Sequence, residues 1–148
     1  MSMTMTVDRD GIPPWSRFNW EEAAAAWAED VTPLAGMALR GRAPFRTGAF
    51  RQSIDDRAQV EPGVATVMFY SQVPYAKWII GGTRAHPIAA VNAKALRWLG
   101  PGGIGANYAK RVQHPGTKAN EFAEVALLPI GPLLSRMFAD AVKEAMKI

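Results

Sequence analysis

The sequence predicts an α+β fold, in which a mainly antiparallel β-sheet is packed by an N-terminal and a C-terminal α-helix. Three observations support this fold class. A long stretch with helical spacing opens the chain and another closes it, and short β-rich runs separated by Gly and Pro lie between them. The chain shows no alternation of strand, helix and strand, the pattern typical of a parallel sheet. Its 148 residues suit one domain with a substantial core.

The domain organisation predicted is a flexible N-terminal arm over residues 1–17, followed by a single α+β domain over residues 18–148. The opening stretch, MSMTMTVDRDGIPP, has no hydrophobic run of signal-peptide length, and its Ser and Thr residues indicate a frayed terminus.

The first helix is expected to begin after Asn19, an N-cap residue with Glu22 three positions later. Pro33 should kink or interrupt it, because proline removes a backbone donor and clashes with the preceding turn. The helix should end near Arg42. Its apolar stripe, in steps of three and four, is Trp20, Ala24, Trp27, Val31, Leu34 and Ala38.

The middle of the chain begins with a short helical turn around Phe50. A hairpin is then predicted around Glu61-Pro62-Gly63 by its turn chemistry. Both faces of the strand after this turn, residues 64–70, are largely apolar, so we expect helices or a neighbouring subunit to cover both sides.

Residues 73–82 indicate a helical turn that ends at paired glycines, and its apolar stretch YAKWII predicts that Trp78 is buried together with Trp27. Two short strands should follow in 85–100, then a glycine-rich loop and a further strand in 101–116. The end of the chain, 119–148, is helical in pattern. Pro129 and Pro132 should bend or divide it, with Pro132 suited to the first turn of the second part.

Composition excludes several classes of protein. The absence of cysteine rules out disulfides and thiolate metal sites. The longest apolar window, 125–134, is half a membrane span and holds two prolines, so we expect a soluble protein without membrane contact. The net charge of +4 is mildly basic, and its cations occur along the whole chain, whereas a dedicated nucleic-acid binder usually concentrates them on one surface.

Catalytic, cofactor and metal sites are not expected. The two histidines have no carboxylate at ligand spacing, and Gly116-Thr117-Lys118 reverses the order that a phosphate-binding loop needs. No serine lies on a Gly-x-Ser-x-Gly elbow. Asp55 and Asp56 next to Arg57 indicate a solvated turn instead of a tuned acid pair. The chain is therefore predicted not to be an enzyme and to need no cofactor.

Two stretches resemble each other, GGTRAHP at 81–87 and HPGTKAN at 114–120. Glycine allows a tight backbone and proline stiffens the exit, so each is interpreted as a rigid tip that presents a cation to another protein. Ordinary solvated turns are the alternative. The acids expected to meet these cations on a neighbour are Asp55, Asp56 and Glu61. The full candidate interface is Arg46, Asp55, Asp56, Glu61, Arg84, His86, His114 and Lys118.

Four stretches, in order, resemble the small neck proteins (head–tail connector or tail-completion proteins) of long-tailed double-stranded DNA bacteriophages. They are APFRTGAFRQSI, VPYAKWIIGGT, HPIAAVNAKALRW and VQHPGTKANEF, within 42–128. The family pattern runs from Ala-Pro-x-Arg-Thr-Gly through Pro-Tyr-Ala before Gly-Thr to His-x-Ile, and it closes on His-Pro-Gly-Thr and a helix begun by Asn-Pro-Phe. Glu121 stands where that last proline is common, and Pro129 and Pro132 are further departures.

The resemblance implies a structural virion protein without enzyme activity, located at the head–tail junction and assembled in the host cytoplasm. Its subunits would form a homo-oligomeric ring, with a hexamer favoured over a dodecamer. Head-completion and tail proteins would flank the ring, and DNA would pass through it without sequence-specific recognition. A tail terminator ring that caps the tail tube is one alternative function. A small basic DNA-binding module is another.

Overall fold

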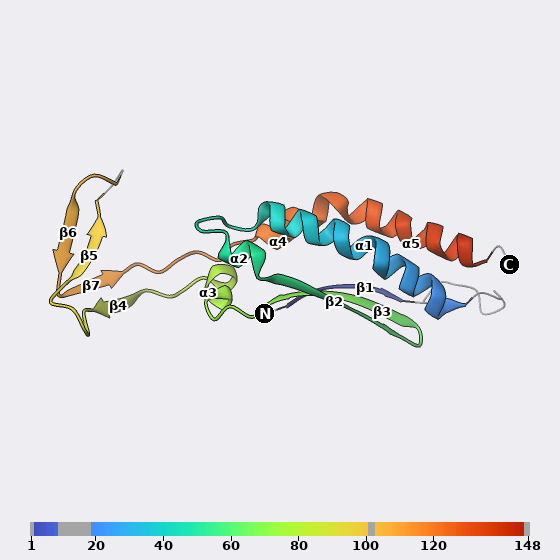
Figure 1. The fold of residues 1–148 in the computed structure, drawn as a ribbon, viewed down its shortest axis with the longest axis horizontal. Coiled ribbons are helices and arrows are strands. Elements are labelled where there is room, and N and C mark those ends of the chain that lie inside the picture. Colours follow the sequence, from blue (N-terminus) through green and yellow to red (C-terminus); the bar gives the residue numbers. More distant parts are fainter. Residues whose placement is uncertain (1, 9–18, 101–102, 147–148) are drawn as a thin grey trace. The chain divides into compact units, whose positions relative to one another are not determined.

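The computed structural model describes residues 2–8, 19–100 and 103–146, which form a mixed α+β fold with antiparallel sheets and helices near both ends (Figure 1). The chain divides into two compact units, where a single domain over 18–148 was expected. We call residues 1–76 with 121–148 the core unit, and residues 77–120 the basic unit.

The core unit contains a three-stranded antiparallel sheet in the order β1-β3-β2. Its strands are β1 (Ser2–Asp8), β2 (Ile54–Glu61) and β3 (Val64–Ser71). The predicted hairpin is confirmed, with Pro62 and Gly63 joining β2 to β3 and Gly63 at a φ of 84°. Pairing in this register places Glu61 opposite Val64.

Strand β1 corrects the expectation of a flexible arm over 1–17. Residues 2–8 pair with β3 along their whole length, while residues 9–17 lie outside the described part of the chain. Met3, Met5 and Val7 are half-buried, whereas Ser2, Thr4 and Thr6 are exposed. This two-residue alternation is the mark of a strand with one covered face, and threonine favours such a surface.

Helix α1 (Trp20–Arg42) starts as predicted, because the Asn19 side chain accepts a hydrogen bond of 3.3 Å from the Glu22 amide. The helix continues through Pro33, which is exposed. Glu29, whose carbonyl would otherwise pair with the missing N–H, is also exposed, so water can satisfy it. The buried residues of the helix are Trp20, Ala23, Ala24, Trp27, Ala28, Val31, Ala35, Gly36 and Leu39.

The predicted stripe on α1 is therefore confirmed as far as Val31 and wrong beyond it, since Leu34 and Ala38 are only half-buried. Helix α1 contacts the sheet and also the C-terminal helices, so its buried face is wider than one stripe. At Gly36 a Cβ would lie 2.9 Å from the Arg40 guanidinium and 3.4 Å from the Phe69 ring, so this position packs against both side chains.

Strand β3 supplies the sheet side of the core. Ala65, Val67 and Phe69 are buried on the face that packs against α1, whereas the alternate residues Thr66, Met68 and Tyr70 are half-buried. One face of this strand is thus fully covered within the described residues, and the expectation of two covered faces holds for one of them only.

The C-terminal segment is helical from Phe122 to Ala145, through α4 (Phe122–Leu127), a 3-10 turn η2 (Leu128–Ile130) and α5 (Gly131–Ala145). Pro132 lies in the first turn of α5, as predicted. The Phe138 ring packs edge-on against Trp20 and Trp27, at centroid distances of 5.8 and 6.1 Å. Helix α5 accordingly lies beside α1 (Figure 1), and the prediction that Trp27 is buried is confirmed at 2% exposure.

Length and composition would also allow Phe122–Ala145 to cross a membrane, the one such helix found in the part of the chain that the structure describes. Only 6% of its most apolar window is buried within the chain. A helix that packs on another protein can be equally long and apolar. The contacts of the Phe122–Ala145 side chains therefore have to be considered before a membrane is inferred.

Two short helices match the predicted turns, α2 (Ala49–Gln52) and α3 (Ala76–Gly81). The basic unit then holds two separate two-stranded antiparallel sheets, β4 with β7 and β5 with β6. Strands β4 and β5, predicted as neighbours along the chain, thus each pair with a later strand. The bounds are β4 (His86–Ala89), β5 (Leu96–Leu99), β6 (Ala106–Ala109) and β7 (Arg111–His114).

Candidate interaction site

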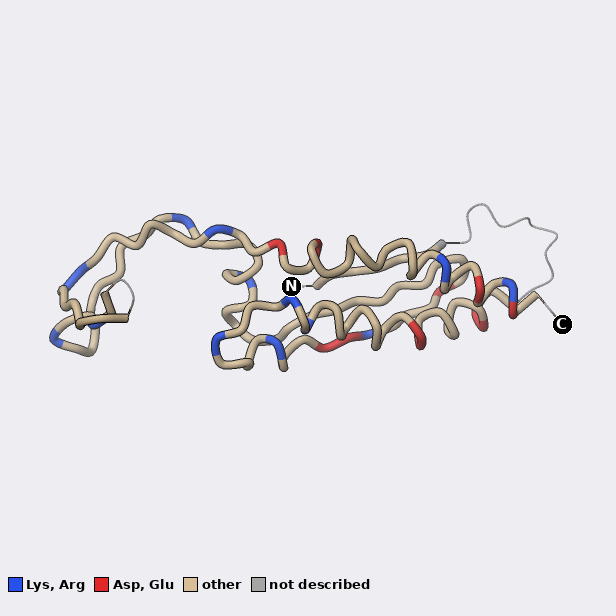
Figure 2. Tube along the Cα trace, turned by 90° about the horizontal axis from the view of Figure 1, so that it is seen from above, with Lys and Arg blue, Asp and Glu red and all other residues tan. Residues whose placement is uncertain are grey.

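Charge separates the two units. Of the chain's 17 Lys and Arg residues, seven lie in the basic unit, which contains none of the 13 Asp and Glu residues. The remaining ten cations and 13 acids give the rest of the chain a net charge of −3. Figure 2 shows the Lys and Arg positions of the basic unit without any Asp or Glu among them. The seven cations are Lys77, Arg84, Lys94, Arg97, Lys110, Arg111 and Lys118.

The cations do occur along the whole chain, and it is the acids that are segregated. The sequence signal is the absence of any acid between Glu61 and Glu121, which a net charge for the whole chain conceals. Positive charge without compensating acids attracts anionic surfaces of proteins or nucleic acids.

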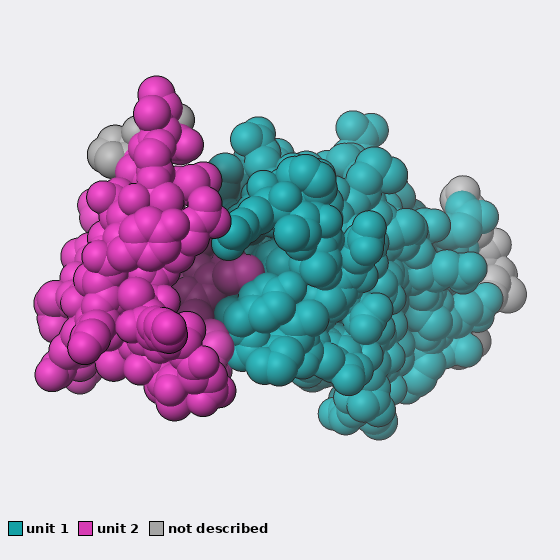
Figure 3. Space-filling view, turned by 60° about the vertical axis from the view of Figure 1, so that its left-hand side comes forward, with its two compact units in different colours: residues 1–76, 121–148 teal, residues 77–120 magenta. Residues whose placement is uncertain are grey.

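The basic unit also lacks a core of its own. None of its described residues is buried, although it contains two tryptophans and several large aliphatic side chains. Figure 3 shows the residues of this unit in magenta. Trp78, predicted to be buried, is 51% exposed. The other exposed large apolar residues are Val91, Trp98, Leu99, Ile104 and Tyr108.

The two stretches that resemble each other in sequence pair with each other in the fold. Thr83 and Thr117 exchange both backbone hydrogen bonds, at 2.8 and 3.0 Å, and the pairing continues in the same register through His86 opposite His114 into β4 and β7. They are therefore two sides of one ribbon, where two independent tips were expected. We call residues 82–89 with 111–118 the GT ribbon.

Two glycines make the close approach of the GT ribbon possible. Gly82 and Gly116 have φ values of 66° and 92°, in the left-handed region that favours glycine. A Cβ on Gly82 would lie 2.3 Å from the Thr117 carbonyl oxygen, and one on Gly116 would lie 2.4 Å from the Thr83 carbonyl oxygen. Each glycine thus faces the backbone of the opposite stretch, which explains why both stretches carry Gly-Thr.

A histidine pair lies next to these glycines. The His86 and His114 rings are 5.1 Å apart between centroids and tilted by 32°. The Nδ1 atom of His114 accepts a hydrogen bond of 3.0 Å from the Gly116 amide, while His86 Nδ1 lies 2.8 Å from the Arg84 carbonyl oxygen, to which it can donate. Local backbone groups thus engage one nitrogen of each ring, and the pair stiffens the ribbon.

The predicted cations Arg84 and Lys118 are both exposed on the GT ribbon. Gly116 lies against the Arg84 backbone and Gly82 against the Lys118 backbone, so the two cations come from opposite stretches at the same part of the ribbon. Both cations are thus carried by one short part of the ribbon.

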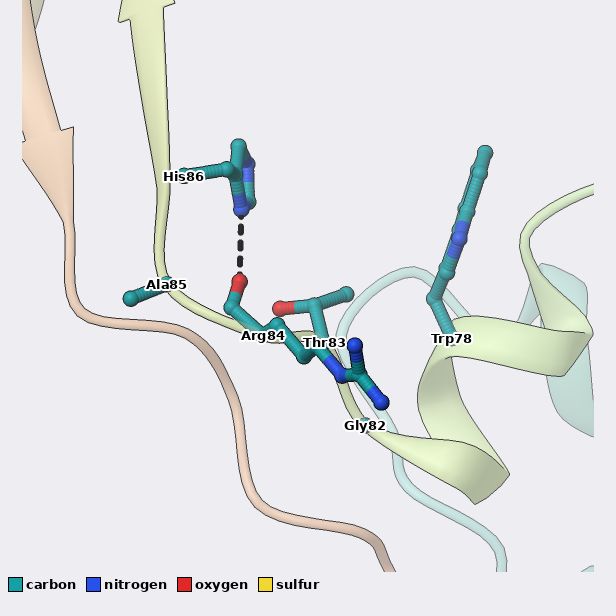
Figure 4. Close-up of a pocket in the computed structure, with 6 residues that line it drawn as sticks. All are labelled: Trp78, Gly82, Thr83, Arg84, Ala85 and His86. Atoms are coloured by element: carbon teal, nitrogen blue, oxygen red, sulfur yellow. Dashed lines mark hydrogen bonds between the residues drawn. The ribbon is translucent and has the colours of Figure 1, made fainter.

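A shallow pocket lies next to Arg84. It is lined by Trp78 of α3 and by the first stretch of the GT ribbon. Figure 4 shows the Trp78 and His86 rings on its two sides, with Thr83 and Arg84 between them. A second hollow lies between the two small sheets. Its apolar and aromatic lining includes Ile88, Leu96, Trp98, Val112 and Pro115.

The other four predicted interface residues belong to the core unit. Arg46 is exposed in the loop between α1 and α2. Asp55 and Asp56 lie on β2 opposite Tyr70 and Phe69, so their expected solvated turn is in fact a strand. Both acids are exposed.

Two of the three acids predicted to meet cations have contacts within their own chain. Asp56 forms an ion pair of 3.7 Å with Arg40, and the Glu61 carboxylate accepts a hydrogen bond from the Gln59 side chain. Exposed pairs of this kind are weak, so both acids can still exchange partners.

Serine hydroxyls in the described residues bond to one another or to the backbone. Ser53 and Ser71 hydroxyls share a hydrogen bond of 2.8 Å, and the Ser135 hydroxyl donates to the Gly131 carbonyl. Within the same part of the chain, no group of three or more Asp, Glu, His or Cys residues could hold a metal ion. The arrangement of greatest interest is therefore a surface, basic and apolar, on the basic unit.

No protein-family model, curated protein or solved structure matches this chain.

Proposed function

We propose that this chain is a structural subunit that assembles with further copies of itself into a ring, as the neck proteins of long-tailed phages do. The ring would stand at the head–tail junction of the virion, between head-completion and tail proteins, and DNA would pass through it. The basic unit is the part of the subunit that makes the contacts.

One observation carries this proposal: the basic unit exposes six large apolar side chains and buries no described residue. Isolated two-stranded sheets are marginally stable in water, and monomeric proteins rarely leave extensive apolar surface uncovered. A protein partner covers such surface and stabilises the unit.

The charge distribution favours a second copy as that partner. The basic unit has seven cations and no acid, while the rest of the chain has a net charge of −3. A ring needs two different patches on each subunit that fit each other around a rotation axis. Opposite charges on the two units provide that asymmetry.

The phage assignment is supported by where the family-like motifs lie. VPYAKWIIGGT, HPIAAVNAKALRW and VQHPGTKANEF span 73–122, and the last Gly-Thr of each outer motif forms the paired centre of the GT ribbon. These family-like motifs thus come together in the fold, as expected if they form an assembly contact.

Native mass spectrometry and electron microscopy of the purified full chain test the proposal. We expect a closed ring, whose mass gives the number of copies. Antibody labelling of phage particles then separates a neck ring, at the head–tail junction, from a tail terminator ring at the end of the tail tube. A monomer at every concentration, and no label on particles, would contradict the proposal.

A DNA-binding module is the second candidate, and the acid-free basic unit with exposed Trp98 and Tyr108 is the observation that favours it. Cations can neutralise phosphates and aromatic rings can stack on bases. If binding to DNA is the main role, the monomer will bind duplex or single strands with an affinity that falls steeply as salt is added. Assembly through apolar surface will depend on salt much less.

A further inference from the structure

A second exposed apolar surface lies on the C-terminal helices of the core unit. Val125, Leu128 and Leu133 are 49, 66 and 45% exposed, and their spacing places them on one side of the helical segment with the exposed Pro129 and Pro132. Phe122 and Ala126, which border these residues on the same helical segment, are buried. We call Val125, Leu128, Pro129, Pro132 and Leu133 the C-terminal stripe.

The C-terminal stripe is bounded by charge at both ends. Glu121 and Glu124 are exposed just before it. Beyond it the same side of α5 continues as Arg136 and Asp140, which pair at 3.9 Å, and Lys143 pairs with Asp140 at 3.2 Å. The apolar surface is thus a short patch with an acidic border at its N-terminal end.

The β5–β6 hairpin of the basic unit presents a surface of matching chemistry. Arg97 pairs with Tyr108 and Leu99 with Ala106, so these four side chains share one face of the hairpin. Leu99 and Tyr108 are 59 and 65% exposed, and Arg97 is exposed too. The alternate residues, Leu96 and Trp98, line the hollow next to β4 and β7, and Arg97 also contributes to its lining. We call Arg97, Leu99, Ala106 and Tyr108 the hairpin face.

We propose that the hairpin face of one copy docks on the C-terminal stripe of the next copy. This inference rests on the proposed function, because it requires that copies of the chain assemble. Leu99 and Tyr108 cover the stripe's apolar side chains, and Arg97 lies against Glu121 and Glu124 at its border. The contact joins two different surfaces, as ring closure requires.

A lipid bilayer is the other occupant to consider, because Phe122–Ala145 is long and apolar enough to span one. The inner side of this segment already packs against other residues of the same chain. Phe122 packs on Phe50 at 5.7 Å, and the Trp27 indole N–H donates a hydrogen bond of 3.3 Å to the Leu134 carbonyl. Insertion into a membrane would break these contacts and expose buried rings to water. A neighbouring copy covers the outer side and leaves the inner side intact.

The absence of cysteine allows a direct test by cross-linking. Two full-length chains of different size, one with Leu99→Cys and the other with Leu128→Cys, are mixed, assembled and oxidised. We expect a disulfide-linked mixed dimer. The matched control replaces Leu128→Cys by Asp140→Cys, which is exposed on the same helical segment beyond the stripe and should form no mixed dimer.

A second variant measures the strength of the contact. Leu128→Asp places a charge in the stripe at an exposed position, so the fold should remain intact and the concentration needed for assembly should rise about tenfold or more. Arg136→Asp, two turns further along the same side, should change assembly much less.

The outcomes separate this inference from the proposed function. Assembly without the mixed dimer, and unaffected by Leu128→Asp, overturns the docking and leaves the ring. A monomer at every concentration overturns both. A disulfide within one chain carrying both cysteines, at monomer mass, shows that the stripe receives the hairpin of its own chain and overturns the exchange between copies. Binding of the monomer to vesicles of phosphatidylglycerol and phosphatidylcholine, lost in Leu128→Asp, shows a membrane occupant instead.

Discussion

The core unit and the basic unit differ in what they do with large side chains. In the core unit, Trp20, Trp27 and Phe69 are almost completely buried and Phe138 packs against both tryptophans. In the basic unit, Trp78 and Trp98 are 51 and 42% exposed, and hydrogen-bonded ribbons replace a core. The same residue type therefore stabilises the fold in one unit and remains available to a partner in the other.

The difference has an energetic consequence. Burial of apolar surface supplies most of the stability of a small domain, and ladder hydrogen bonds alone contribute modestly. The core unit can be stable without a partner, whereas the basic unit needs one to reach comparable stability.

The largest expected effect is the contrast between two tryptophans. Trp27→Ala leaves a cavity between α1 and α5 and should lower the free energy of unfolding by about 3–5 kcal/mol. Trp78→Ala, the matched change at an exposed position, should cost less than about 1 kcal/mol in the unassembled chain. Denaturant unfolding followed by circular dichroism measures both, and equal losses would show that Trp78 belongs to the core.

A smaller effect is expected in the GT ribbon. Gly82→Ala brings a Cβ against the Thr117 carbonyl and strains a backbone at positive φ, so the ribbon should be destabilised locally by about 1–3 kcal/mol. This local destabilisation should be measurable as faster hydrogen exchange of the Thr83 and Thr117 amides. Gly81→Ala is the control, because a Cβ there would meet nothing within 4 Å. Unchanged exchange in Gly82→Ala would mean that the two stretches do not pair as described.

Charge reversal on the GT ribbon should change the stability of the chain less than Gly82→Ala does, but it should strongly impair assembly. Arg84 and Lys118 are exposed, and an exposed charge contributes about 0–1 kcal/mol to stability, so Arg84→Glu with Lys118→Glu should leave the thermal unfolding of the monomer nearly unchanged. Incorporation into particles should be blocked, because a ring repeats the contact at each interface. Arg136→Glu with Lys143→Glu carries the same charge change on α5 and should assemble normally. Wild-type assembly of the ribbon variant would show that these two cations make no assembly contact.

The smallest expected effect is that of added ligands. A ligand at a hundred times its dissociation constant would stabilise the folded chain by about 2.7 kcal/mol. Among the residues that the structure describes, no third metal ligand joins His86 and His114. Gly116-Thr117-Lys118 does not have the residue order of a phosphate-binding loop. Zinc, magnesium and ATP should therefore leave the melting temperature unchanged. A clear increase with any of them would refute the prediction.

Local signals predicted much of the core unit. The Asn19 cap, the stripe from Trp20 to Val31, the Pro62-Gly63 hairpin and Pro132 in the first turn of α5 all follow from short-range rules of capping, periodicity and turn chemistry. Strand β1 was missed because its alternation of Met and Val with Ser and Thr was interpreted as a polar terminus.

The sequence by itself determined the fold class, the helical segments near both ends and the close likeness of GGTRAHP to HPGTKAN, since each depends on residues near one another in the chain. Only the tertiary structure decided that these two stretches pair, and that β4 pairs with β7 and β5 with β6. It also decided that Trp78 is exposed while Trp27 is buried. The reason is physical. Strand partners and burial depend on contacts between residues distant in sequence, and local propensity carries no information about which distant segment will supply them.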